Sequence, residues 1–138
     1  MQLACLYNQV MSLEEEIKRT IFKHVMLTKF LQDYIIFDIK TAKNLEHIKD
    51  VCNFEEIVRS VDAKPYRGRS FFVNVGNLHT VIHEDIRRFI KCIERNEINL
   101  AKTIMKDGRY NQNMELFIDA LTQWMEEIRK DSPLKSKR

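Results

Sequence analysis

Two histidines one helical turn apart are the residues of this chain whose spacing most resembles that of a metal site. His79 and His83 lie at i and i+4 in the sequence HTVIHE, and on one face of a helix two such imidazoles could share a zinc ion. The zinc-protease pattern is H-E-x-x-H, whereas here Glu84 follows the second histidine. A third ligand would have to come from Cys52 or Cys92, and no spacing in the sequence indicates which. We therefore expect neither a bound metal nor another cofactor.

The other residue types that support catalysis do not form recognisable patterns. The chain has three cysteines and four histidines, but no G-x-S-x-G elbow and no phosphate-binding G-K-[ST] loop. Acidic pairs such as Glu55–Glu56 and Glu126–Glu127 are adjacent in the sequence, so their carboxylates diverge around a helix. We therefore expect that the protein is not an enzyme and has no catalytic residues.

The sequence PYRGRSFFVNVGN, residues 65–77, differs in composition from the rest of the chain. It contains two of the three glycines, one of the two prolines, two arginines and two adjacent phenylalanines. Aromatic and arginine side chains dominate the hot spots of protein interfaces, and they also stack on bases and pair with phosphates. A further pair of arginines follows on the next predicted helix. The candidate partner-binding residues are therefore Tyr66, Arg67, Arg69, Phe71, Phe72, Arg87 and Arg88.

Two functions are compatible with these residues. The first is a non-catalytic adaptor or scaffold domain that binds a partner peptide or amphipathic helix, through a groove between helices or through residues 65–77. The alternative is an accessory domain that binds single-stranded nucleic acid such as RNA through residues 66–72. The net charge of +3, from 23 basic and 20 acidic residues, is small for a nucleic-acid binder. A protein partner is therefore the favoured hypothesis.

The elements that carry these residues are predicted to be the helices of a single domain. The chain has 138 residues, of which 44% are hydrophobic and 31% charged, as is typical of a globular domain. Three glycines and two prolines are too few for the turns of a β-sandwich or barrel. We therefore expect an all-α bundle of about five or six mostly antiparallel helices over residues 1–131. The basic segment 132–138 is expected to be a flexible tail.

The first long helix is predicted to run from residue 12 to about residue 33. Ser12 and Glu15 form a capping box at its start. Residues 33–40 are rich in strand-forming side chains, and the sequence leaves open whether they are helical or extended. We expect the helix either to continue through them or to end and restart near Thr41. Its main apolar face is predicted to consist of Leu13, Ile17, Ile21, Val25, Thr28 and Leu31.

Three apolar side chains of this helix, Phe22, Met26 and Phe30, lie off its main face. They contact either a second layer of the bundle or a partner in an exposed groove, and the sequence leaves both alternatives open.

Beyond the first helix, apolar spacing predicts a short helix from Phe54 to near Asp62, a helical hairpin over residues 78–107, and a last helix from Asn111 or Asn113. Gly108 is expected to end the hairpin as a left-handed C-cap. Residues 63–77 then form one long irregular connection, in which residues 71–75 are either helical or extended.

We expect this connection to bridge two helical halves of the domain. Phe71 and Phe72 are then buried anchors, while Tyr66, Arg67 and Arg69 are displayed to solvent.

Further features concern location and modification. The sequence contains no stretch of 18 apolar residues and no signal-peptide pattern, and its odd number of cysteines predicts reduced thiols in an intracellular protein. Ser132, Pro133 and Lys135 resemble a proline-directed kinase site, so Ser132 is the candidate modification site. The basic sequence KSKR is compatible with a nuclear as well as a cytoplasmic location. The oligomeric state is left open by the sequence.

Overall fold

The computed structural model describes residues 12–36, 52–106 and 108–131. Within these ranges the chain is all-α and has no strand, which confirms the predicted helical bundle. No helix in these ranges has the length and apolarity that crossing a membrane requires. The predicted tail and Ser132 lie outside the described residues. The elements are α2 (Leu13–Ile36), α4 (Phe54–Arg59), the 3-10 helix η1 (Val61–Tyr66), α5 (Ser70–Glu94), α6 (Ile98–Lys106) and α7 (Gly108–Lys130).

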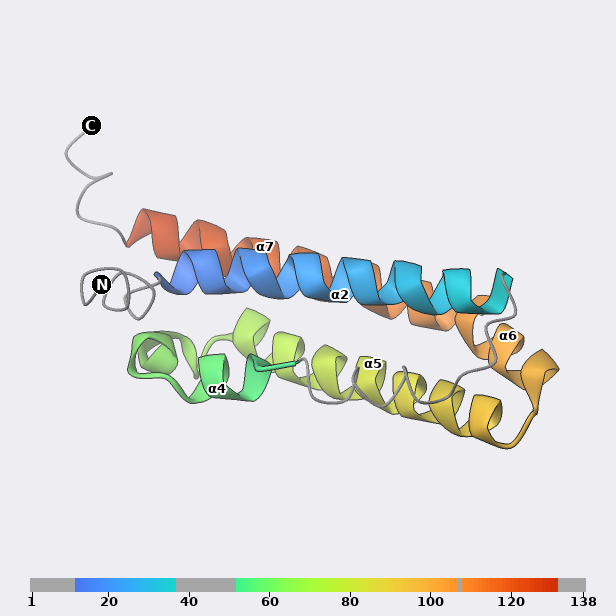
Figure 1. The fold of residues 1–138 in the computed structure, drawn as a ribbon. Helices are drawn as coiled ribbons and strands as arrows, with labels where there is room; N and C mark the ends of the chain where they lie inside the picture. The colour runs from blue at the N-terminus through green and yellow to red at the C-terminus, as the bar shows by residue number, and fades with distance from the viewer. Residues whose placement is uncertain (1–11, 37–51, 107, 132–138) are drawn as a thin grey trace, which may run out of the picture.

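The long helices α2, α5 and α7 form the body of the bundle in the described residues (Figure 1). Helices α2 and α7 lie side by side in opposite directions, and α5 packs against α7, also in the opposite direction. The short α6 joins the end of α5 to the start of α7. An ion pair joins Arg129, near the end of α7, to Glu14 at the start of α2, and the Thr28 hydroxyl lies 2.8 Å from the Tyr110 hydroxyl at the other end. These two contacts fix the alignment of α2 with α7.

The largest core side chains lie where α5 meets α7. Trp124, Phe117 and Phe89 are completely buried, and truncating side chains of this kind to alanine costs about 3–5 kcal/mol. The Trp124 ring lies 5.1 Å from the ring of Phe72 and 6.1 Å from that of Tyr66, between ring centroids. The end of η1 and the start of α5 are thereby attached to the second half of α7.

The start of α2 agrees with the prediction, but the phase of its buried face differs by one residue. The Ser12 hydroxyl accepts a hydrogen bond from the Glu15 amide at 3.2 Å, as in the predicted cap. Val25, however, is 44% exposed, whereas His24 is only 3% exposed. His24 lies seven positions after Ile17, which is two helical turns, so it falls on the same buried face. The polar His24 therefore occupies the buried position that was predicted for the apolar Val25.

The long irregular connection predicted over residues 63–77 is wrong. The 3-10 helix η1 reaches Tyr66 and α5 already begins at Ser70, so the linker is only Arg67–Arg69. Pro65 fits within η1 because its fixed φ matches that of a 3-10 helix. Residues 71–75, which the sequence left open, are helical.

The predicted left-handed C-cap at Gly108 is also wrong. No glycine in the described ranges has a positive φ, and α7 begins at Gly108 instead of at Asn111 or Asn113. The left-handed residue is Asn96, with φ 59°, between α5 and α6. Asparagine adopts this conformation more readily than other non-glycine residues.

Candidate metal centre

Four potential metal ligands from three separate segments lie together in the interior. They are His24 on α2, Cys52 two residues before the start of α4, and His79 and His83 on α5. One nitrogen or sulfur atom of each residue lies within 4.8 Å of the corresponding atoms of the other three. A tetrahedral zinc site needs ligand atoms about 3.3–3.6 Å apart, given bonds of about 2.0–2.3 Å. Small side-chain rotations would therefore close these residues around one ion.

Cys52 is in contact with two of the three histidines. Its Sγ lies 3.1 Å from Nε2 of His79 and 3.8 Å from Nε2 of His24. Both imidazoles thus present the same ring nitrogen to the sulfur. These separations bracket the nitrogen–sulfur spacing of a tetrahedral zinc site.

A hydrogen bond through its other nitrogen orients the His24 ring. Nδ1 of His24 lies 2.8 Å from the carbonyl oxygen of Thr20. Because a carbonyl oxygen only accepts, Nδ1 must carry the proton, and Nε2 keeps its lone pair for the cluster. Metal-binding histidines in proteins are usually held in this way, by a second ring N–H donated to a carbonyl or a carboxylate.

His83 has a buried nitrogen that lacks a partner. Its Nε2 is buried and makes no hydrogen bond in the part of the chain that the structure describes. Leaving such an atom unpaired costs about 1–3 kcal/mol. Trp124 Nε1 also lacks a partner among the described residues, but an indole N–H only donates and has no lone pair for a metal. For His83 a metal ion bound by its three neighbours would supply the partner.

Burial keeps the histidines neutral, which is the form that binds metals. Burial, followed by the charges of His83 and His24, lowers the pKa of His79 from 6.5 to about 3. Burial, followed by His24 and Arg87, lowers the pKa of His83 to about 4, and burial also lowers the pKa of His24. Burial raises the pKa of Cys52, so its thiol would have to release a proton on binding a metal.

Two phenylalanines cover the cluster. The Phe54 ring lies 4.4 Å from the ring of His79, and the Phe117 ring lies 5.0 Å from that of His24, between centroids. Both phenylalanines are almost completely buried. An apolar cover of this kind excludes water, and four protein ligands leave no open coordination position. The arrangement is therefore suited to holding an ion and not to activating a substrate on it.

The sequence identified three of these four residues but not their combination. His79, His83 and Cys52 come together, whereas Cys92 is buried elsewhere on α5 and is not part of the cluster. The expectation of no metal site was based on the lack of a third ligand, and the fold brings two further potential ligands, Cys52 and His24, to the histidine pair. His24 was missed, although a histidine seven residues after Ile17 falls on the buried face of a helix.

The aromatic residues among the candidate partner-binding residues lie in the core. Tyr66 and Phe71 are buried, and Phe72 is half-buried against Trp124. Burial of Phe71 agrees with the prediction, but the predicted display of Tyr66 is wrong because its ring packs between Phe71 and Trp124.

The arginines of the same segment are exposed and hold the linker in place. Arg67 donates hydrogen bonds to the carbonyl oxygens of Val58 and Ser60. Arg69 pairs with Glu127 at 3.0 Å, and its guanidinium carbon lies 5.1 Å from the centre of the Tyr66 ring. Both side chains remain accessible to a partner while they stabilise the linker.

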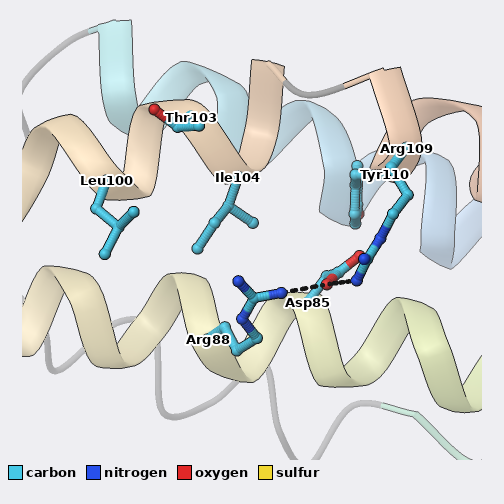
Figure 2. Close-up of a pocket in the computed structure, with 7 residues that line it drawn as sticks. All are labelled: Asp85, Arg88, Leu100, Thr103, Ile104, Arg109 and Tyr110. Atoms are coloured by element: carbon cyan, nitrogen blue, oxygen red, sulfur yellow. Dashed lines mark hydrogen bonds and ion pairs between the residues drawn. The ribbon is translucent and has the colours of Figure 1, made fainter.

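The two arginines predicted on the next helix have different surroundings. Arg87 is exposed on α5. Arg88 and Arg109 both donate to one carboxylate oxygen of the buried Asp85, each at 3.3 Å (Figure 2). They line a small cavity of about 120 Å³ between α5 and α6. Arg88 thus belongs to an ion-pair cluster that links α5 to the start of α7.

Comparison with known proteins gives no match: no family model, no curated protein and no solved structure is similar to this chain.

Proposed function

We propose that this chain is a helical metal-binding domain in which His24, Cys52, His79 and His83 hold one Zn²⁺ ion as a structural cross-link. The supporting observation is that the four ligand atoms lie within 4.8 Å of one another, although they come from three segments. One thiolate with three imidazoles suits zinc, and a closed four-ligand site is typical of structural zinc.

The ion would attach a weakly held part of the chain to the long helices. Helix α4 has only six residues, and a helix of this length is not stable in isolation. Cys52 lies two residues before its start, so a zinc ion bound there would fasten the start of α4 to both α2 and α5. Binding energy of this kind adds directly to the free energy of unfolding.

The first test is the zinc content and its effect on stability. Protein is first stripped of metal with a chelator, the chelator is removed, and Zn²⁺ is added. We expect the chain to take up one Zn²⁺, measured by elemental analysis, and its melting temperature to rise. At a free zinc concentration of 100 times Kd the free energy of unfolding rises by about 2.7 kcal/mol. Co²⁺ in the same site should give the visible absorption of a tetrahedral, thiolate-containing complex. Protein that takes up no zinc, and melts identically with and without chelator, would contradict the proposal.

Protein binding is a second candidate function, favoured by one specific observation. Phe22, Val25, Met26 and Phe30 are exposed on one face of α2, and contiguous exposed apolar surface marks interaction sites. This observation supports a protein-binding surface on α2. The sequence had predicted a different surface, the segment 65–77. Partner binding can be compared between variants with substitutions on α2 and variants with substitutions at Arg67 and Arg69. The surface whose substitutions abolish binding is the interface.

Binding of single-stranded nucleic acid stays a prediction. The exposed Arg67, Arg69 and Arg87 support it, while the burial of Tyr66 and Phe71 removes two of the rings expected to stack on bases. A gel shift with single-stranded RNA should weaken steeply with salt if phosphates are contacted. That the protein is not an enzyme also stays a prediction.

A further inference from the structure

The outer face of α2, defined here as Phe22, Val25, Met26 and Phe30, is apolar and solvent-exposed. Their exposed fractions are 64%, 44%, 47% and 40%. The spacing i, i+3, i+4 and i+8 places them on one continuous face about two and a half turns long. The opposite side of α2 is buried in the bundle through Ile17 and Leu31. A helix that is apolar on two sides normally lies between two packed layers, and the described residues provide only one.

Charged residues flank this outer face symmetrically about Met26. Arg19 lies seven residues before Met26 and Asp33 lies seven residues after it. Seven residues are two helical turns, so all three lie on the same side of α2. Arg19 is exposed and Asp33 is partly exposed. Phe22 and Phe30 lie four residues before and after Met26. Lys23 and Lys29, three residues before and after Met26, lie on either side of the apolar centre. The two ends of the face therefore carry opposite charges, and its centre is flanked by basic side chains.

We propose that the outer face of α2 binds a second copy of the same chain, with the two α2 helices antiparallel and Met26 of both copies on the two-fold axis. In this arrangement Phe22 of each copy meets Phe30 of the other, and Arg19 of each meets Asp33 of the other. The interface is self-complementary, as two-fold symmetry requires. A parallel pair would instead place Arg19 against Arg19 and Asp33 against Asp33, and the like charges would repel.

The size of the face predicts a weak dimer. A pair of single helices buries less surface than a standard protein interface, so we expect association that depends on concentration. Sedimentation equilibrium on the full chain, both with and without added Zn²⁺, should show a monomer–dimer equilibrium. A chain that remains monomeric at protein concentrations up to about 1 mM has a dimer dissociation constant above that value. Such a result overturns the proposal.

A matched pair of variants tests whether the outer face is the interface. Met26→Glu places a charge at the centre of the face and should weaken dimerisation by at least about tenfold. Leu116→Glu on α7 is the control, because Leu116 is 48% exposed and also helical but lies on another element. Circular dichroism should show unchanged helix content for both. Equal effects of the two substitutions overturn the assignment of the face.

A charge exchange tests the orientation. Arg19→Asp leaves two acidic groups opposed in the antiparallel pair and should weaken the dimer, and adding Asp33→Arg to the same chain should restore it. A protein that dimerises through a different surface would respond to neither change. A failure of Asp33→Arg to restore association overturns the proposed pairing.

Cross-linking gives an independent reading of the symmetry. With Met26 on the axis, Met26→Cys should form a disulfide between two copies under mild oxidation, whereas Arg19→Cys should not, because the two positions 19 lie at opposite ends of the interface. Cross-links at both positions would mean a parallel pair and overturn the proposal. This inference rests on the second candidate function, protein binding at α2, but the two can fail separately. If the chain is monomeric and Met26→Glu abolishes binding of a different protein, self-association is wrong while protein binding at α2 is retained.

Discussion

The Sγ of Cys52 lies 3.1 Å from Nε2 of His79, although the two residues are 27 positions apart in the sequence. A thiol and an imidazole at this separation share one proton, or bind one ion in its place. The contact joins the segment before the short α4 to the middle of the long α5, and His24 and His83 lie beside it. The identity of the group that Cys52 and His79 share is therefore the central experimental question for this protein.

The first prediction compares the two described cysteines. Cys52→Ala removes the only sulfur of the cluster, so we expect zinc affinity to fall by more than about 100-fold and the zinc-dependent rise in melting temperature to disappear. Cys92→Ala leaves all four ligands in place and should cost only about 1 kcal/mol through the lost core volume. Zinc titration of both variants, followed by thermal melting, makes the comparison. If both variants keep the zinc effect, Cys52 is not a ligand.

The second prediction concerns the acid stability of the metal-free protein. In the folded chain the pKa of His79 is about 3 and that of His83 about 4, whereas histidines in the unfolded chain titrate near 6.5. Between these values the unfolded state binds more protons than the folded state. The free energy of unfolding therefore falls as the pH is lowered from 6.5 towards 4, by about 1.4 kcal/mol per pH unit for each such histidine. Above pH 6.5 these groups contribute no pH dependence.

Urea unfolding at pH 7, 6 and 5 measures this slope. The single tryptophan, Trp124, is completely buried and reports unfolding by its fluorescence. The control is the double variant His79→Gln and His83→Gln, whose stability should depend less on pH in this range. An identical slope in both proteins would show that other groups cause the acid sensitivity.

The third prediction concerns Asp85, which is buried and accepts from both Arg88 and Arg109. Asp85→Asn removes the charge that two guanidinium groups share, and we expect a loss of about 1.5–3 kcal/mol in the free energy of unfolding. Arg88 and Arg109 are more than half exposed, so water can solvate them, and this limits the loss. The matched control is Asp119→Asn on the exposed face of α7, which should change stability by less than about 0.5 kcal/mol. Equal losses would mean that the Asp85 ion pairs do not stabilise the fold.

Much of the helical architecture could be predicted from the sequence because local patterns determine it. The Ser12 cap and the recurring apolar residues located α2, and the same periodicity located α5 and α7. The errors fall where two local signals compete. Gly68 and Gly76 together with Pro65 suggested an irregular segment, but helical packing of Phe71 and Val75 against the core extends α5 back to Ser70.

The metal cluster could be predicted only in part, for a different reason. The spacing of His79 and His83 is a local feature and is visible in the sequence. The addition of Cys52 and His24 depends on how α2 and the start of α4 pack on α5, which no sequence spacing encodes. The one-residue phase error on α2 had the same effect, since it placed Val25 on the inner face and hid His24.

The fourth prediction uses His24 to distinguish a metal ligand from a packing residue. His24 is 3% exposed, and burial lowers its pKa, so it is a polar group in an apolar site. His24→Leu replaces it by an apolar side chain of similar size and higher helix propensity. We expect the metal-free protein to become more stable by about 0.5–2 kcal/mol at pH 7, as is common for substitutions that remove a functional polar group. The same variant should lose most of its zinc affinity.

Urea unfolding with and without zinc measures both effects in one protein. Wild type should gain stability on zinc addition, and His24→Leu should start higher and gain little. The control is Thr20→Val one turn earlier, because Thr20 is also buried and its carbonyl remains available to orient His24. It should keep the zinc response. If His24→Leu binds zinc as tightly as wild type, His24 is only a packing residue, and the ion would be held by Cys52, His79 and His83 alone.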